Sequence, residues 1–264
     1  MVEECNFSFA GKESFDYGIF LANVGNIPDT LVSGVDSEII SASVSGNSSR
    51  LIYGVKENDS LKFEITLMLP RHCTFETMCD IKHWLFGQNK PQALKFHHPD
   101  LEDYYFRCFF RYGEDWHMEG AYKAMKVSIE CVCPYAYKQD TSFIVSSAAP
   151  TSIFIDSAEL CGIKPKISFI VPSNINQITI NSQFTNTSLK VKSSSTHTLT
   201  EGDNVFIDCQ RKIITINHVL SIDNLDFSDG YGFVSFVDGD NIIEGTNGVD
   251  ITFTYTPTRR IGGV

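Results

Sequence analysis

The sequence predicts a mainly β protein with two domains: an N-terminal β domain with one α-helix (residues 1–137) and a C-terminal antiparallel β-sandwich (residues 138–264). Segments that alternate apolar and polar residues, as half-buried strands do, recur along the whole chain. Helical spacing of apolar residues occurs in one segment. The 264 residues exceed the common domain size of roughly 100–150 residues, so two domains are expected.

The strands of the first domain follow from residue patterns. Residues 61–69 and 125–133 alternate apolar and polar side chains almost without error, and Pro134 is expected to end the second ladder. Residues 38–44 and 51–55 flank a segment rich in serine, glycine and asparagine, which predicts two strands divided by a turn.

Two further strands, residues 93–96 and 104–112, are expected on either side of a loop that contains His97 and His98. Adjacent histidines suggest a metal site. Neighbouring strand residues would point to opposite faces, however, and no third ligand stands close in sequence. A loop role is therefore favoured over metal binding.

Residues 75–85 predict the single helix. Apolar side chains recur at helical spacing, at Phe75, Met78, Ile81, Trp84 and Leu85. Thr74 is the expected N-cap and Gly87 the expected stop, with an acidic residue in the first turn and basic residues near the end. We expect Trp84 in the core rather than on a ligand-binding surface.

The first domain is expected to close at residues 134–137, because the segments that follow are first polar and then rich in small residues, with room for a short strand between them. Beyond this point short strands recur without any helical period, which is typical of a β-sandwich. The predicted strands are residues 166–171, 177–181, 189–192, 205–208, 213–217, 232–237 and 249–255.

Residues 201–217 form the clearest hairpin of the second domain. Val205 and Ile207 fall on one face of its first strand, and Ile214 and Ile216 on one face of its second. The polar residues 210–212 supply the reversal. The hairpin brings together no paired base, metal spacing or phosphate loop.

Composition limits the classes of function. Acidic residues outnumber basic ones by 32 to 21, and the net charge is −7 for residues 1–137 and −4 for residues 138–264. Neither half shows the basic patch of a nucleic-acid binder or a membrane-surface protein. Glu3 and Glu4 stand where a secretory signal would have basic residues, and no segment approaches the roughly 20 apolar residues that span a bilayer.

The eight cysteines are sparse and form no Cys-x-x-Cys pair, which favours synthesis in a reducing cytoplasm. Cys131 and Cys133 are expected on one strand face as buried thiols. Metal ligation is the less favoured alternative, because Cys-x-Cys supplies only half of a tetrahedral zinc site.

The motifs of common enzyme classes are absent: the sequence has no Gly-x-Ser-x-Gly, Gly-x-x-x-x-Gly-Lys, Gly-x-Gly-x-x-Gly or His-Glu-x-x-His. We therefore predict no enzyme, no catalytic residue and no cofactor. One acidic cluster could supply oxygen ligands for calcium; its members are Asp223, Asp226, Asp229, Asp238 and Asp240. Its spacing departs from the calcium-loop pattern, so solvated turns between strands are the favoured explanation and calcium the less favoured alternative.

Carbohydrate binding by the second domain is a further alternative. Most of its aromatic residues, such as Phe169, Phe206 and Phe253, lie in apolar strand runs where core packing is expected. Tyr231, in a loop, is the candidate platform for a sugar ring.

Four segments, taken in order, resemble the distal tail proteins of long-tailed bacteriophages, the ring-forming hubs that join tail tube to tail tip. They are the strand-turn-strand at residues 7–19, the helix end at residues 81–85, the domain exit at residues 127–137 and the hairpin at residues 202–209. The Gly-Asp-x-x-x-Ile-Asp-Cys hairpin and the Pro-Tyr-x-Tyr boundary are the most specific. In the family a glycine or asparagine-glycine often follows the second hairpin strand, where this chain has Asn217-His218.

Gly11, Asp16 and Gly18 belong to the first of these segments. Turn geometry explains the two glycines as well as any contact would. We therefore name no site residue from the resemblance.

The resemblance implies an N-terminal domain that assembles into a homo-hexameric ring and a galectin-like C-terminal sandwich that projects outward. It implies as partners the tail tube protein, a tail-associated fibre or lysin protein, and receptor-binding or baseplate proteins on the second domain, with no membrane partner. The chain would be made in the bacterial cytoplasm and reside at the tail tip of the virion, where DNA passes through the ring during ejection. An acidic channel would repel the phosphates of that DNA.

Overall fold

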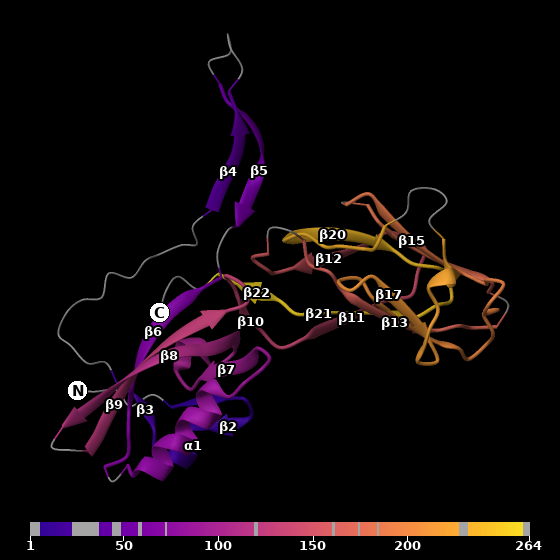
Figure 1. The fold of residues 1–264 in the computed structure, drawn as a ribbon. Helices are drawn as coiled ribbons and strands as arrows, with labels where there is room; N and C mark the ends of the chain where they lie inside the picture. Colours follow the sequence, from indigo (N-terminus) through magenta and orange to yellow (C-terminus); the bar gives the residue numbers. More distant parts are fainter. Residues whose placement is uncertain are drawn as a thin grey trace. The chain divides into compact units, whose positions relative to one another are not determined.

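The structure is a computed structural model. It describes residues 6–22, 37–43, 49–57, 60–71, 73–118, 121–159, 162–173, 175–183, 185–226 and 232–260. These residues form two compact units, the first running to Tyr137 and the second comprising Lys138–Arg259 (Figure 1). Arg260, which the sequence predicts in the second domain, lies with the first unit, where its guanidinium stands 5.8 Å from the centre of the Tyr135 ring.

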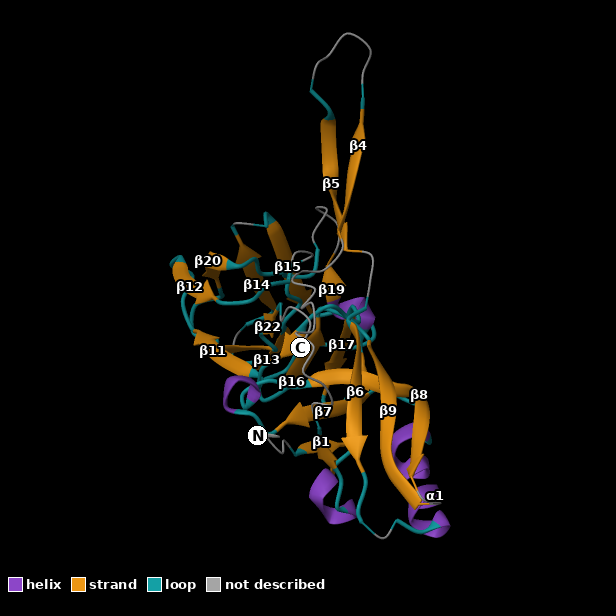
Figure 2. Ribbon diagram, turned by 90° about the vertical axis from the view of Figure 1, so that its left-hand side faces the viewer, coloured by secondary structure: helices purple, strands orange, loops and turns teal. Residues whose placement is uncertain are grey.

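The first unit is built on a seven-stranded antiparallel sheet with the strand order β2-β1-β7-β8-β9-β6-β3. Figure 2 shows β9 between β6 and β8 in this sheet. The strands are β1 (Phe7–Phe9), β2 (Lys12–Glu13), β3 (Phe20–Leu21), β6 (Lys62–Met68), β7 (Gln92–Phe96), β8 (Phe106–Met118) and β9 (Ala121–Cys131). The unit also contains β4 (Ser37–Ala42), β5 (Leu51–Glu57), β10 (Ala136–Tyr137) and the 3-10 helices η1 (Ser14–Tyr17) and η2 (Pro99–Leu101). The predicted mainly β fold is confirmed.

The predicted end of β9 is wrong by two residues. The strand stops at Cys131, and Cys133 lies beyond it, half-buried, with its thiol donating to the hydroxyl of Tyr137 at 3.0 Å. The strand ends where its partner on one side begins: Lys62, the first residue of β6, is the partner of Glu130. Cys131 is buried as predicted, but the two cysteines do not share a strand face.

The helix α1 (Phe75–Phe86) begins and ends where the sequence predicts. The hydroxyl of Thr74 accepts the Thr77 amide at 3.2 Å, as an N-cap does. Gly87 is the C-cap of the helix, and its φ of −77° shows that it does not adopt the left-handed conformation. A Cβ at Gly87 would lie 2.4 Å from the His83 carbonyl oxygen, and this close approach is what requires glycine.

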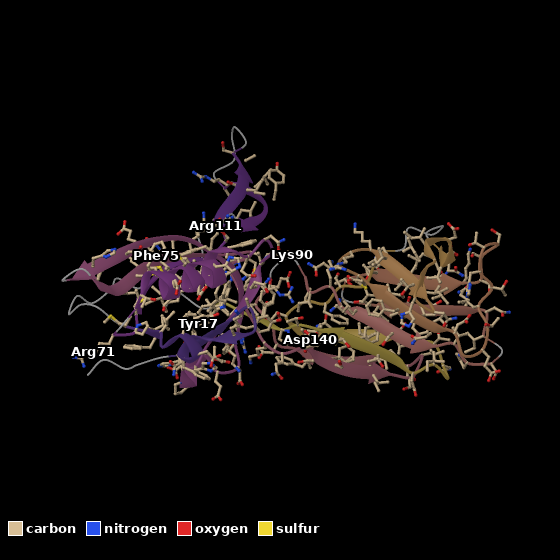
Figure 3. The ribbon with its side chains drawn as sticks, turned by 60° about the horizontal axis from the view of Figure 1, so that its bottom comes forward. Tyr17, Arg71, Phe75, Lys90, Arg111 and Asp140 are labelled. Atoms are coloured by element: carbon tan, nitrogen blue, oxygen red, sulfur yellow. The ribbon has the colours of Figure 1, made fainter. Side chains whose placement is uncertain are left out.

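Four of the five apolar helix residues are buried, and Phe75 is the exception at 72% exposed (Figure 3). At 100° per residue, Phe75 lies about 110° from the centre of the stripe formed by the other four. Trp84 is buried as predicted, and its indole nitrogen donates to the Phe9 carbonyl at 2.9 Å. The helix is thereby fixed to the N-terminal strand β1.

The second unit contains two antiparallel sheets. The six-stranded sheet has the order β11-β21-β13-β16-β17-β18, and the five-stranded sheet β12-β20-β14-β15-β19. The strands of the first are β11 (Thr141–Val145), β13 (Lys166–Ile170), β16 (Asn204–Asp208), β17 (Ile213–Ile216), β18 (Val219–Leu220) and β21 (Ile251–Tyr255). Those of the second are β12 (Thr151–Ile155), β14 (Gln177–Ser182), β15 (Thr187–Lys192), β19 (Leu225–Asp226) and β20 (Gly239–Glu244); η3 (Ile222–Asn224) and β22 (Thr258–Arg259) complete the unit.

The two sheets share one buried core, which makes this unit the predicted β-sandwich. Ile167, Val205 and Ile214 of one sheet and Ile178 and Ile243 of the other are fully buried in the same cluster. Burial alternates along the strands, as in β21, because successive side chains point to opposite faces.

The strand predicted over residues 232–237 is wrong. Val234, Ser235 and Phe236 are all buried in succession, and the segment forms a single isolated bridge, from Phe236 to Ile163. β20 lies instead where the sequence shows acidic turn residues. Asn241 is fully buried and takes the place of an apolar residue on the inner face of β20. Its side-chain amide donates hydrogen bonds to the Val237 and Gly239 carbonyls.

Candidate assembly site

β4 and β5, which we call the arm, form a two-stranded antiparallel sheet with no other strand partner among the described residues (Figures 1 and 2). A β-bulge interrupts the register after Ile40, so Tyr53 has no Cα partner on β4. The arm matches the two strands that the sequence predicts there.

Five apolar side chains of the arm are exposed: Ile39, Ile40, Leu51, Ile52 and Tyr53. Neighbouring residues on a strand point to opposite faces, so both faces of the arm are apolar. Ile52 is 69% and Tyr53 68% exposed. An isolated two-stranded hairpin is at best marginally stable in water, and contiguous apolar patches mark interaction surfaces. The arm is therefore the best candidate for an assembly contact.

The sequence pattern did not lead us to predict a site at these residues. The signal is present as Ile39-Ile40 and Leu51-Ile52-Tyr53, runs of adjacent apolar residues that leave neither face of a strand polar. A strand that is apolar on both faces must be covered on both.

The edges of the seven-stranded sheet offer less to a neighbouring chain. Its edge strands, β2 and β3, are two residues long. Short edge strands are one way in which proteins prevent pairing between sheets. Sheet extension at these edges is thus a weaker assembly mechanism than contact through the arm.

The N-terminal segment with Gly11, Asp16 and Gly18 has a structural role in the unit. Ala10 and Gly11 both have positive φ in the two-residue turn between β1 and β2. Gly18, at φ of 66°, caps η1 and donates its amide to the Phe15 carbonyl at 2.9 Å. Asp16 is exposed in the same 3-10 helix. Turn and cap geometry thus accounts for both glycines.

The described residues contain no group of three or more side chains that could hold a metal ion. His97 pairs with Glu13 at 2.8 Å, and His98 accepts the Asp100 amide as the cap of η2. Both histidines lie between β7 and η2, outside any strand, so the predicted loop position is confirmed.

Three of the five acidic residues considered for calcium make separate contacts within the protein. Asp226 pairs with Lys192 at 3.0 Å, Asp223 accepts from Thr196 and Asp238 accepts the Ser157 amide. Asp229 and the candidate sugar platform Tyr231 lie outside the described residues. No described helix is long and apolar enough to cross a membrane.

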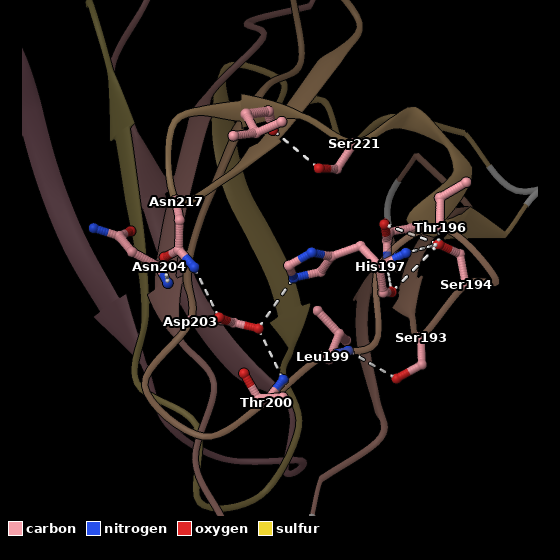
Figure 4. A network of polar contacts seen from close by, with 12 residues as sticks. Ser193, Ser194, Thr196, His197, Leu199, Thr200, Asp203, Asn204, Asn217 and Ser221 are labelled. Atoms are coloured by element: carbon pink, nitrogen blue, oxygen red, sulfur yellow. Dashed lines mark hydrogen bonds and ion pairs between the residues drawn. The ribbon is translucent and has the colours of Figure 1, made fainter.

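Asp203, from the hairpin motif, is the centre of a polar network (Figure 4). It is 6% exposed and accepts the Thr200 amide at 2.8 Å, the Asn217 side-chain amide at 2.8 Å and His197 Nε2 at 3.2 Å. These bonds fasten the loop that precedes β16 to the turn that follows β17. The network fixes the loop and contains no nucleophile beside a base.

Acid is expected to weaken this network. Hydrogen bonds, first from the Thr200 amide and then from Asn217 and His197, lower the pKa of Asp203 to about 2 against the opposing effect of burial. Because the pKa of Asp203 is lower in the folded state, its ionised carboxylate stabilises the fold at every pH above the unfolded pKa near 4. This stabilisation, about 2 kcal/mol, is lost as the pH falls toward 2. Hydrogen exchange of residues 193–217 between pH 2 and 4 measures this loss of stability. In Asp203→Asn the exchange protection should depend less on pH. An unchanged profile in that variant would contradict this assignment.

Asn217 and His218 form the two-residue turn between β17 and β18, with φ of 49° and 68°. Positive φ at both positions is typical of a type I′ turn, which favours Asn-Gly. Asn217 also accepts the Asn204 amide at 2.9 Å. His218 stands where the resembling family often has glycine, and it adopts the left-handed backbone that glycine would adopt without strain.

We expect His218→Gly to stabilise the second unit by about 0.5–1 kcal/mol, because glycine adopts this backbone without the left-handed penalty. Asn217→Gly is the matched control. It relieves the same type of strain but removes bonds to Asp203 and Asn204, so it should destabilise. Urea unfolding followed by circular dichroism measures both, and equal effects in the two variants would contradict the explanation.

Exposed aromatic residues in the second unit differ partly from the expectation. Phe169 and Phe253 are buried as predicted, but Phe206 is 37% exposed because it lies on the outer face of the six-stranded sheet, beside Ser168 and Thr215. Phe154 is 68% exposed on β12.

Comparison with known proteins identifies both units. The family model for the phage tail protein N-terminal domain matches residues 2–133. The model for the C-terminal domain of the siphovirus-type tail component matches residues 163–258. No curated protein matches the sequence.

Solved structures share the fold. The Dit protein of phage SPP1, described as a paradigm of the hub adsorption apparatus in phages infecting Gram-positive bacteria, has a TM-score of 0.73 at 11% identity, covering 97% of this chain and 99% of its own. A chain of the phage P2 baseplate, activated with calcium, has a TM-score of 0.50 at 11% identity over 100% of both chains. The baseplate activated with strontium gives 0.51 at 11% identity, with 98% and 99% coverage.

Proposed function

Because the chain belongs to the phage tail proteins that share this N-terminal domain, we propose that it is the hub of a tail tip, a structural component whose copies close into a homo-hexameric ring. The observation behind the ring is the arm, whose two faces present exposed apolar side chains that one chain leaves uncovered. An identical neighbour can cover them, and repeating a head-to-tail contact around an axis closes a ring.

The proposed ring joins the tail tube protein on one side to a tail-associated fibre or lysin protein on the other. The second unit supplies a rigid sandwich on which receptor-binding or baseplate proteins dock. Its role is shape and attachment without catalysis, in keeping with the absence of any nucleophile–base pair in the network around Asp203. DNA passes through the channel in transit.

The acidic balance supports a channel to which DNA does not adhere. The N-terminal 137 residues have a net charge of −7, and a wall of like charge repels phosphates. A ring structure whose channel is lined mainly by lysine and arginine would contradict this part of the proposal.

Oligomeric state tests the hub proposal directly. Mass photometry and negative-stain imaging of the full chain over a range of concentrations should show six-fold rings with an open centre that become more abundant as concentration rises. Chemical cross-linking should yield a ladder ending at the hexamer. Monomers at every concentration, both alone and in the presence of tail tube protein, would overturn the ring.

Saccharide binding by the second unit is the alternative function, and one observation favours it. Phe154 is exposed at the outer face of the five-stranded sheet, and its partner across the strands is Asp240 of β20. An exposed aromatic ring offers an apolar face on which a sugar ring can stack, and a carboxylate accepts hydrogen bonds from hydroxyl groups. Glycan-array binding by the full chain that disappears in Phe154→Ala would promote this alternative over a purely docking role.

A further inference from the structure

Cys108 and Cys131 face each other across two central strands of the first unit. Their Cα atoms are direct partners in the register of β8 and β9. Both side chains are buried, at 0% and 2% exposed, and the two thiols hydrogen bond to each other. Both are free cysteines in the structure.

The backbone hydrogen bonds show that this is a non-hydrogen-bonded pair. Cys131 donates its amide away from β8, to the Leu61 carbonyl at 2.8 Å, while Val132 donates to the Arg107 carbonyl at 2.9 Å. The Cα atoms of such a pair are about 4.5 Å apart. That spacing lies at the short end of the roughly 4.4–6.8 Å that disulfides span. A bond can therefore form without moving the strands.

We propose that Cys108 and Cys131 are a redox modification site, two thiols in a reducing cytoplasm that become a cross-strand disulfide when a small peroxide oxidises the released protein. One thiolate attacks hydrogen peroxide, giving a sulfenic acid and hydroxide, which takes a proton to become water. The second thiol attacks that sulfur and releases another water. In total the two thiols lose two electrons and two protons, and the peroxide is reduced to two waters. This inference goes beyond the tail hub function and does not depend on ring formation.

Oxidation should be slow at this site. The hydrogen bond from Cys131, followed by burial, raises the pKa of the Cys108 thiol, so the reactive thiolate is scarce. Cys79, which is exposed on α1, should react with peroxide first. The disulfide closes a loop that includes the β8–β9 hairpin, and we expect it to raise the melting temperature of the first unit by roughly 5–10 °C.

Peptide mapping of the full chain tests the site. The folded protein is treated with hydrogen peroxide, quenched with an alkylating agent under denaturing conditions and digested with trypsin. Cleavage after Arg107 and Arg111 isolates Cys108, whereas Cys131 and Cys133 share the peptide of residues 127–138. We expect these two peptides to be linked, and dithiothreitol to separate them.

Two variants distinguish the bonded partner. Cys133→Ser should retain the link, because Cys133 lies beyond β9 and its thiol contacts Tyr137. Cys131→Ala should abolish it, and the thermal shift on oxidation should disappear with it. Alkylation of both Cys108 and Cys131 after peroxide has fully oxidised Cys79 would overturn the proposal. So would a link that forms only in urea, or one that persists in Cys131→Ala; the wild-type map decides even if that variant fails to fold.

Discussion

Replacing Ile39 and Ile52 of the arm with lysine is expected to abolish ring assembly while leaving the monomer folded. The two side chains are 59% and 69% exposed, so lysine at these positions costs the isolated chain little. In the proposed ring the same side chains are covered by a neighbour. Burying each isoleucine contributes about 1.5–3 kcal/mol, and a lysine there would have to be desolvated as well. Each contact should weaken by at least a factor on the order of 100.

Mass photometry at one fixed concentration compares the double variant with the wild-type protein, and circular dichroism verifies that the monomer is folded. Phe75→Lys and Phe154→Lys are matched controls, because both residues are as exposed as the arm residues, at 72% and 68%, but lie outside it. We expect rings in both controls. Rings in the arm variant at wild-type abundance would show that the arm does not form the contact.

Sequence reasoning succeeded where burial alternates with the period of the element. The strand over residues 61–69 and the hairpin over residues 201–217 have an apolar residue at nearly every inward position, and the structure places both as predicted. Thr74 and Trp84 were predictable for a similar reason, because a cap and a core aromatic each satisfy a local rule of helix formation.

The sequence patterns gave wrong predictions where contacts with distant segments, and not the local alternation of apolar and polar residues, determine the structure. β20 was not predicted because Asn241 occupies an inward position and finds its hydrogen-bond partners in a neighbouring turn. Residues 234–236 are all buried without a strand, since the core surrounds them on more than one side. Such positions are set by segments distant in the sequence, and no residue pattern of their own indicates them.

The candidate assembly site was not predicted, for a different reason. The strands of the arm were predicted, but the consequence of their composition follows only when a structure shows that they have no other strand partner in the described part of the chain. In the sequence, Ile52 and Tyr53 fit a strand that is buried in the core equally well. Their exposure becomes known only from the structure. The candidate site is therefore indicated by the apolar side chains that the fold leaves exposed, and the sequence alone does not show which these are.

Trp84→Ala is expected to destabilise the first unit by about 3–5 kcal/mol, the largest effect of any single substitution considered for this protein. Trp84 stacks on Tyr17 at 4.7 Å and on Phe7 at 5.9 Å, and its indole nitrogen donates to Phe9. These contacts join α1 to β1 and η1, which are distant from it in the sequence. Truncation leaves a cavity and removes the indole donor from the Phe9 carbonyl.

Trp84→Phe separates the two contributions, because it keeps an aromatic ring but loses the donor. We expect it to cost about 1–3 kcal/mol, and Trp116→Phe, at a residue 42% exposed, to cost less than about 0.5 kcal/mol. Guanidinium unfolding followed by far-ultraviolet circular dichroism measures all three variants. A loss below about 1 kcal/mol in Trp84→Ala would show that β1 is held by its ladder with β7 alone.

The consequence for assembly follows from the position of β1 near the edge of the sheet, between β7 and the two-residue β2. If Trp84 no longer holds Phe9, β1 and β2 can detach together and expose the backbone of β7. An unprotected edge of that kind pairs with other chains without a defined register. We therefore expect Trp84→Ala to form heterogeneous aggregates on mild heating, whereas the arm variant stays monomeric, and light scattering at equal concentration distinguishes the two outcomes.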